Sequence, residues 1–413
     1  MKTTLFLPLL LSLLSLTATA QTWTAQNSGT SSHLLSIHFV DERTGYTVGT
    51  AGVILKTTNG GTTWQSQNSG TAEALYAVCF TDALHGVAVG DNNRIVRTTD
   101  GGTTWTSVSS TAFVSFRAVW FLDANVGFIT GGLSFGSGTI LQTTDGGATW
   151  TDISPNNSIA IYSVFFTDAN TGYASDYNGY ILKTVDGGDF WTADLVSDNH
   201  LFGLFFTDAD NGYCVGGDAV ANTVILKTTD AGTTWTATNN PDPTANYFTD
   251  VEFADANTGY AIGGQVDNNT GNLLKTTDAG LTWTVEPTMP ATTSRLYRLS
   301  LPSATVGYAC GLDGTILKKQ GVSADHEQEA AGSSFALSPN PSTDRLTLAW
   351  NHTDLSTADL RIVGPLGQVL RTLAISVNNA HLEVPVSDLP SGLYLLEIRS
   401  KGRVLAIKKF IKE

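Results

Sequence analysis

Lys56-Thr-Thr-Asn-Gly-Gly-Thr-Thr-Trp64 is the stretch that decides the fold, because the same nine-residue phrase returns along the chain with small changes. Each copy ends in tryptophan, and successive tryptophans lie 41, 45, 41, 44 and 48 residues apart. A nearly constant period of this length indicates a repeated structural unit. The other copies are Arg97–Trp105, Gln142–Trp150, Lys183–Trp191, Lys227–Trp235 and Lys275–Trp283.

The residues around this phrase predict four short strands in each unit. In the first unit we expect strands over residues 35–39, 46–49, 53–58 and 63–67, with a polar turn at 40–45 and a tight hairpin at Asn59-Gly-Gly61. Asn-Gly and Asp-Gly provide the positive φ angles that tight hairpins require. Four antiparallel strands in about 43 residues are the size of one β-propeller blade.

A second marker, Phe-x-Asp-x-x-x-Gly, joins the first two strands and counts the units. It appears six times between Phe39 and Gly259, and a seventh time with Leu301 in place of phenylalanine. The seventh unit has no tryptophan strand, but Gln21–Gly29 matches Thr63–Gly70 and can supply it. We therefore expect an all-β, seven-bladed propeller over residues 21–321, closed by its N-terminal strand.

Residues 1–20 have the pattern of a cleaved signal peptide. Lys2 precedes an apolar core at residues 5–16, and Ala18-Thr-Ala20 is a small-residue cleavage site. A membrane anchor would need about 20 continuous apolar residues, whereas this run is shorter and contains Pro8. We expect export and a mature chain that begins at Gln21.

Charge and cysteine content exclude several classes of function. The chain has 22 Lys and Arg against 37 Asp and Glu, so it lacks the basic surplus typical of nucleic-acid binding. Cys79, Cys214 and Cys310 are an odd number in apolar runs, so we expect buried free thiols and neither a metal site nor a cofactor. Oxygen ligands for calcium occur at Asp218 and at residues 267–269, but the complete ligand spacing is missing.

The chain changes character after the propeller. Residues 322–334 are small and polar, which predicts a linker. Alternating strands punctuated by Gly and Pro then fill residues 335–413, which predicts a β-sandwich of roughly 75 residues.

The repeated phrase, reduced to Thr-x-Asp-x-Gly-x-x-Trp, resembles the Asp-box (BNR) repeat. Its longer form, Ile-Leu-Lys-Thr-Thr-Asp-Gly-Gly-x-Thr-Trp, resembles propellers related to the photosystem II assembly and stability factor. This resemblance implies that the aspartate caps a hairpin and that the tryptophan packs between sheets, which are structural roles. The residues concerned are Asn59, Trp64, Asp100, Trp105, Asp145, Trp150, Asp186, Trp191, Asp230, Trp235, Asp278 and Trp283.

The C-terminal region resembles the type A C-terminal sorting domain of the type IX secretion system, found in Bacteroidetes. The resemblance rests on four features in order, namely Ser338-Pro-Asn-Pro341, Gly364-Pro-Leu-Gly367, Gly392-Leu-Tyr394 and the basic residues 408–413. It implies passage through the periplasm and delivery to the cell surface or the medium, with the type IX machinery as a partner of residues 335–413. The alternative is an ordinary Ig-like binding module.

Asp-box propellers include sialidases and xyloglucanases, so a secreted glycan-active hydrolase is an alternative function. A sialidase-like site needs an arginine cluster, but Arg97 lies in a repeat and Arg43 in a polar turn, and no Phe/Tyr-Arg-Ile-Pro phrase is present. The other propeller arginines are Arg94, Arg117, Arg295 and Arg298. Hydrolysis also needs two facing carboxylates. An acidic chain has many Asp and Glu residues, so their presence does not identify a catalytic pair. We therefore assign no catalytic residue.

Candidate binding residues follow from the position of the variable loops, which lie opposite the Asp boxes in a four-stranded blade. In each blade, the residue six positions before the marker aspartate lies where the innermost strand reaches that face. Four aromatic residues and an arginine there could bind a protein or a glycan, or could instead pack between blades. The candidates are Tyr76, Arg117, Tyr162, Phe202 and Tyr297, with Leu35 and Thr249 at the remaining positions.

Overall fold

The computed structural model describes residues 22–112, 114–133, 136–155, 159–218, 223–242, 247–265, 269–290, 293–320, 335–338, 342–350, 358–363, 369–374, 381–389, 392–400 and 403–412. The predicted signal peptide and linker lie outside the described residues. The chain forms two compact units, Met1–Gly321 and Val322–Glu413. Within the described ranges the helical segments are single 3-10 turns at Thr50–Gly52 and Leu312–Gly314, and no helix could span a membrane.

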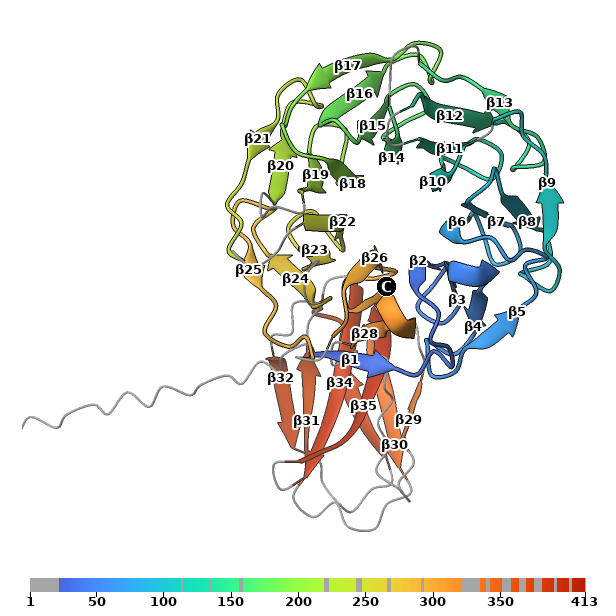
Figure 1. Cartoon of the computed structure of the whole chain (residues 1–413). Coiled ribbons are helices and arrows are strands. Elements are labelled where there is room, and N and C mark those ends of the chain that lie inside the picture. The colour runs from blue at the N-terminus through green and yellow to red at the C-terminus, as the bar shows by residue number, and fades with distance from the viewer. Residues whose placement is uncertain are drawn as a thin grey trace, which may run out of the picture. The chain divides into compact units, whose positions relative to one another are not determined.

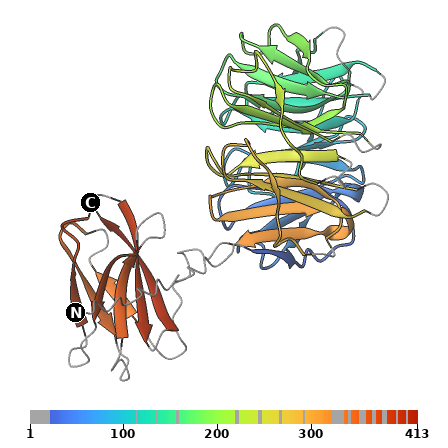
Figure 2. The same ribbon diagram turned by 90° about the vertical axis from the view of Figure 1, so that its left-hand side faces the viewer.

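The first unit consists of seven four-stranded antiparallel sheets, which surround a common axis like blades (Figures 1 and 2). The all-β fold class predicted from the sequence is confirmed. The first three blades are β2 (Leu34–Phe39), β3 (Gly45–Gly49), β4 (Ile54–Thr57) and β5 (Gln65–Gln67); β6 (Leu75–Phe80), β7 (Gly86–Gly90), β8 (Ile95–Thr98) and β9 (Thr106–Val108); and β10 (Phe116–Phe121), β11 (Gly127–Gly132), β12 (Gly138–Thr143) and β13 (Thr151–Asp152).

Blades 4 to 6 repeat this order of strands. They are β14 (Ile161–Phe166), β15 (Gly172–Asp176), β16 (Tyr180–Thr184) and β17 (Thr192–Leu195); β18 (Leu201–Phe206), β19 (Gly212–Gly216), β20 (Val224–Thr228) and β21 (Thr236–Ala237); and β22 (Tyr247–Phe253), β23 (Gly259–Gly264), β24 (Gly271–Thr276) and β25 (Thr284–Val285).

The seventh blade joins the two ends of the propeller. Its strands β26 (Leu296–Ser300), β27 (Val306–Gly311) and β28 (Ile316–Gln320) are completed by β1 (Thr22–Gln26), which pairs antiparallel with β28. Trp23 of β1 is 2% exposed and meets the Tyr260 ring of blade 6 edge to face at 5.8 Å. On the other side, Tyr308 stacks on Phe39 of blade 1 at 3.5 Å. The first and last strands of the propeller therefore share one sheet.

The second sequence marker forms a compact turn between the first two strands. In blade 1, Asp41 Oδ1 accepts hydrogen bonds from the backbone N–H groups of Arg43 and Thr44, both at 2.7 Å. A Cβ on Gly45 would lie 2.6 Å from the Phe39 ring. Only glycine therefore lets the phenylalanine fold back over the start of the second strand.

The Asp box forms a longer turn than the tight hairpin predicted at Asn59-Gly-Gly61, and that prediction is wrong. β4 ends at Thr57 and β5 begins at Gln65, because side-chain acceptors replace strand pairing in between. Thr57 Oγ1 accepts from Gly61 N at 2.9 Å, and Asn59 Oδ1 accepts from Thr63 N at 3.0 Å. The second bond recurs at 2.8 to 3.0 Å between Asp100 and Thr104, Asp145 and Thr149, Asp186 and Phe190, Asp230 and Thr234, and Asp278 and Thr282.

The boxes also tie each blade to the next. Lys56 Nζ and Tyr46 Oη both donate to the carbonyl oxygen of Gly101, at 2.6 and 3.0 Å. Tyr46 stacks on Phe80 at 3.7 Å, and Trp105 meets the same ring edge to face at 5.9 Å. Equivalent donations run from Arg97 to Gly146, Gln142 to Gly187, Lys183 to Ala231, Lys227 to Ala279 and Lys318 to Gly60.

The three cysteines are free, as the sequence predicts. Cys214 and Cys310 are buried between blades, and Cys79 is partly buried on an innermost strand. Burial raises the pKa of the Cys79 thiol to about 12. A neutral thiol of this kind acts as a small apolar side chain.

The second unit is a pair of facing sheets. One contains β29 (Phe335–Ser338), β30 (Arg345–Trp350) and β33 (His381–Pro385), and the other contains β31 (Ala358–Val363), β32 (Val369–Ala374), β34 (Gly392–Ser400) and β35 (Arg403–Lys412). Its core includes Leu348, Ile362 and Phe410, each fully buried. Of the four features that predicted a sorting domain, Gly364-Pro-Leu-Gly367 and residues 339–341 lie outside the described residues.

Candidate functional site

A β-bulge at the start of each innermost strand creates the candidate site. In blade 2, Leu75 pairs with Gly90 and Ala77 pairs with Val89, so Tyr76 between them has no partner in the register. Bulges re-aim a side chain away from the regular alternation of a strand. The same register shift occurs in all seven blades, and the bulged residues are Leu35, Tyr76, Arg117, Tyr162, Phe202, Thr249 and Tyr297.

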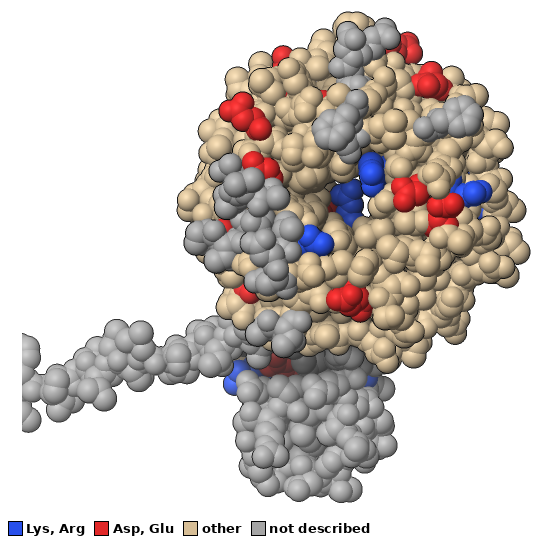
Figure 3. Space-filling model, in the orientation of Figure 1, with Lys and Arg blue, Asp and Glu red and all other residues tan. Residues whose placement is uncertain are grey.

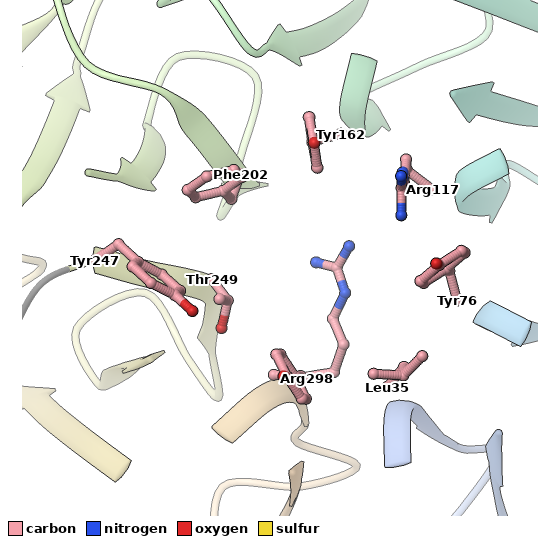
Figure 4. A pocket seen from close by; sticks show the side chains of 9 residues that line it. Leu35, Tyr76, Arg117, Tyr162, Phe202, Tyr247, Thr249 and Arg298 are labelled. Carbon is pink, nitrogen blue, oxygen red and sulfur yellow. The ribbon is translucent and has the colours of Figure 1, made fainter. Parts of the chain in front are cut away.

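These seven bulged residues line one cavity of about 320 Å³, which we call the channel mouth (Figure 4). The five candidate residues from the sequence are therefore brought together. Two further residues line it, Tyr247 and Arg298. The volume lies at the small end of the range for ligand pockets.

The mouth lies on the face opposite the Asp boxes. The box and marker turns of one blade are joined, since Gly60 N donates to the Arg43 carbonyl at 2.8 Å. The bulged ends instead lie beside the loops between second and third strands, since Asp91 N donates to the Ala74 carbonyl at 2.9 Å. The conspicuous repeats and the cavity thus occupy different faces.

Aromatic rings form a nearly continuous wall around the mouth. Tyr162 and Phe202 meet edge to face at 5.1 Å, and Phe202 contacts Tyr247 at 5.8 Å. Arg295 continues the wall, because its Nη1 donates to Tyr247 Oη at 2.7 Å and its guanidinium lies 5.6 Å from the Tyr297 ring. These contacts fix the rings before any ligand arrives.

Arg117 lies next to this wall, between Tyr162 and Tyr76 (Figure 4). Its guanidinium lies 4.3 Å from the centroid of Tyr76 and 5.8 Å from that of Tyr162, within cation–π range. Tyr76 Oη donates to Asp91 Oδ2 at 2.9 Å, and Ser115 Oγ donates to Asp91 Oδ1 at 2.7 Å. Burial raises the pKa of Tyr76, so its hydroxyl stays protonated and keeps the ring in place.

Arg298 connects the mouth with the channel beneath it. Its Nη1 forms an ion pair with Asp250 Oδ1 at 3.1 Å, and Asp250 Oδ2 accepts from Leu299 N at 2.8 Å. Burial raises the pKa of the Asp250 carboxyl, while the positive charge of Arg298 opposes that rise. Arg298 faces the mouth with the rest of its guanidinium (Figure 4).

A second cavity of about 320 Å³ continues down the channel. Its lining includes Trp120, His38 and Glu252. Burial and the nearby Asp250 raise the pKa of Glu252 to about 8, and burial lowers the pKa of His38 to about 4. At neutral pH both groups are therefore uncharged in the folded protein.

Tyr247 and Arg298 were not predicted as site residues. β22 begins at Tyr247, one residue earlier than the innermost strands of blades 1 to 5 begin. Counting back six residues from the marker aspartate therefore gives Thr249 and does not find Tyr247. Arg298 follows the bulge, where blades 1 to 5 carry Ser, Ala or Gly. An arginine at a position where five of the seven blades carry a small residue was the available signal.

The possible calcium ligands receive no further support. Residues 267 and 268 lie outside the described residues. Across the ranges that the structure describes, no three His, Cys, Asp or Glu residues are grouped closely enough to hold a metal ion.

The sheets, the bulges and the channel define the class of this protein as a β-propeller built from Asp-box blades. Residues 16–74 and 64–194 match the sequence profile of the photosynthesis system II assembly factor YCF48 family, and residues 336–413 match that of the secretion system C-terminal sorting domain. Both resemblances inferred from the sequence are therefore confirmed. No curated protein matches the chain.

Solved structures support the same architecture. YCF48 bound to a D1 peptide superposes with a TM-score of 0.60 at 20% identity, covering 73% of this chain and 97% of that one. YCF48 from Cyanidioschyzon merolae gives 0.60 at 23% identity, with 73% and 100% coverage. PorZ, a surface component of the type IX secretion system of Porphyromonas gingivalis, gives 0.54 at 13% identity, with 94% and 60% coverage. At these identities the likeness shows the fold alone.

Proposed function

We propose that the chain is an exported, non-catalytic binding module that holds a partner at the channel mouth. The observation that carries this proposal is the mouth itself, where seven bulges from seven blades direct side chains into one cavity. Rings held by contacts with one another lose little freedom on binding, which favours a preformed site.

The C-terminal match supports delivery by the type IX machinery to the cell surface or the medium. A signal peptide at residues 1–20 would begin that route. A segment of another protein is the first class of partner to consider, because one of the structurally similar propellers holds a peptide. A surface glycan is the second class, and scaffolding of an assembly is the biological role that either would serve.

The purified chain can be screened against a peptide library, a glycan array and fluorogenic glycosides. We expect saturable binding of one ligand class without turnover. Tyr162→Ala should reduce that binding at least tenfold, because it opens the aromatic wall. Turnover of a glycoside that a single carboxylate substitution abolishes would contradict the proposal and favour the hydrolase.

A further inference from the structure

The side chains that line the mouth offer apolar surface and cationic donors. Among the described lining residues, four are tyrosine, two are arginine and none is Asp, Glu, Asn or Gln. Sugar hydroxyls both donate and accept hydrogen bonds, so a glycan would need acceptors that this lining supplies only through hydroxyl groups. The lining is better matched to a ligand that combines an anionic group, which only accepts hydrogen bonds, with an apolar part.

The positive charge of Arg117 has no counter-ion in the described part of the chain. None of the ion pairs among the described residues involves Arg117, and its Nε is buried without a hydrogen-bond partner there. Asp91, the carboxylate that binds the hydroxyl of the neighbouring Tyr76, also accepts a hydrogen bond from Ser115. Arg117 is partly exposed at the mouth, so its guanidinium is accessible to an incoming anion and can form charge-assisted hydrogen bonds with it.

Arg298 brings a second guanidinium to the same cavity. Figure 4 shows it extending toward the middle of the ring of side chains, on the side where Arg117 lies. Its one anionic partner, Asp250, bonds Nη1 and uses its other oxygen on Leu299 N. Figure 3 likewise shows Lys and Arg atoms in and around the central opening. Two guanidinium groups facing one small cavity form a donor set that suits a single carboxylate.

We propose that the mouth binds a carboxylate on an extended segment of another protein, with an apolar residue beside it. Arg117 and Arg298 hold the carboxylate, and the wall of Tyr162, Phe202 and Tyr247 packs against the apolar neighbour. This inference rests on the proposed function and names the chemistry of its partner. The carboxylate can come from an acidic side chain or from a chain end, since both present the same two oxygens.

Four ligand sets test this assignment by fluorescence polarisation with the whole mature chain. Three are labelled hexapeptide libraries of otherwise apolar and small residues. The first has a fixed Glu and an amidated C-terminus, the second has Gln at that position and a free C-terminal carboxylate, and the third has Gln and an amidated C-terminus. The fourth is an oligogalacturonate. We expect the first or second library to bind at least tenfold more tightly than the third.

Charge-removing variants locate the binding. Arg117→Gln and Arg298→Gln should each weaken binding at least tenfold, whereas Arg43→Gln, an exposed arginine on the box face, should leave it unchanged. Arg298→Gln alone leaves the Asp250 carboxylate without its ion-pair partner and can unfold the chain. The double variant Arg298→Gln/Asp250→Asn removes both charges, so it should melt like the wild type while still failing to bind.

Three results would overturn the inference. Equal binding of the neutral amidated library would show that no carboxylate is required, and binding of the oligogalacturonate alone would show that the partner is not a protein. In both cases a loss of affinity in Tyr162→Ala would leave the proposed function intact. Peptide binding that is insensitive to Tyr162→Ala, Arg117→Gln and Arg298→Gln would instead remove both proposals.

Discussion

The hydroxyl groups of Tyr213 and Tyr260 occupy equivalent positions in neighbouring blades but have different surroundings. Tyr213 Oη donates to the carbonyl of Ala279, in the box of blade 6, at 2.8 Å. Blade 7 has no box, and Tyr260 Oη is buried without a hydrogen-bond partner among the described residues. Lys319 fills part of the space, with Nζ 4.4 Å from the centroid of the Tyr260 ring.

This difference predicts opposite effects of one substitution. Tyr213→Phe should destabilise the protein by about 1 kcal/mol, the usual net contribution of a hydrogen bond. Tyr260→Phe should leave the melting temperature unchanged or raise it, because it removes an unsatisfied buried hydroxyl. Calorimetry of the two variants checks this, and an equal loss in both would show that Tyr260 has an acceptor.

Glu252 makes stability depend on pH. Its folded pKa is about 8, whereas the unfolded carboxyl titrates near 4.5, so between these values the folded state binds a proton that the unfolded state lacks. Stability from this group is therefore fully present below pH 4.5 and falls by about 1.4 kcal/mol per pH unit as pH rises toward 8.

Glu252→Gln isolates that contribution, because other titrating groups cancel in the comparison with the wild type. The variant should have the higher melting temperature at pH 8, and its advantage should shrink as pH falls to 5. Melting curves between pH 5 and 8 measure it. A constant difference across this range would mean that Glu252 is ionised in the folded state.

At the level of strands, the bulge directs one side chain from each blade into a common cavity, which is the proposed binding site. The sequence located the five candidate residues because the marker aspartate fixes the register of every innermost strand. Arg298 was missed because its place at the mouth depends on the ion pair with Asp250, which joins strands 48 residues apart in neighbouring blades, and its one sequence signal was an arginine where blades 1 to 5 carry a small residue. The box turn was predicted too short. Thr57 and Asn59 accept hydrogen bonds from backbone N–H groups four residues further on, and the preferences of Asn-Gly for tight turns do not include such side-chain bonds.

Strand β1 provides the strongest test of the blades' assembly. Removing residues 22–27 deletes five partner positions on β28 and the buried Trp23. Loss of a buried tryptophan alone costs about 3 to 5 kcal/mol, so the melting temperature should fall by roughly 10 °C. Thr24→Ala, an exposed change on the same strand, serves as control. An unchanged melt of the deletion would show that β1 does not complete the ring.

For the whole molecule, the sorting domain predicts where the propeller is found. In a Bacteroidetes host with a type IX system, deletion of residues 335–413 should leave the propeller in the periplasm, because the match to the sorting domain covers nearly the same residues. Immunoblots of periplasmic, surface and medium fractions measure this. Normal export of the deletion would contradict the assignment.

We propose that the partner binds at the channel mouth rather than on the box face. The most direct measurement is the affinity of the best ligand from the peptide and glycan screen for the wild type, Tyr162→Ala and Phe190→Ala. Phe190 is 68% exposed in the fourth Asp box and is the matched aromatic on the other face. We predict at least a tenfold loss for Tyr162→Ala and none for Phe190→Ala. A loss only in Phe190→Ala would show that the partner binds on the box face instead.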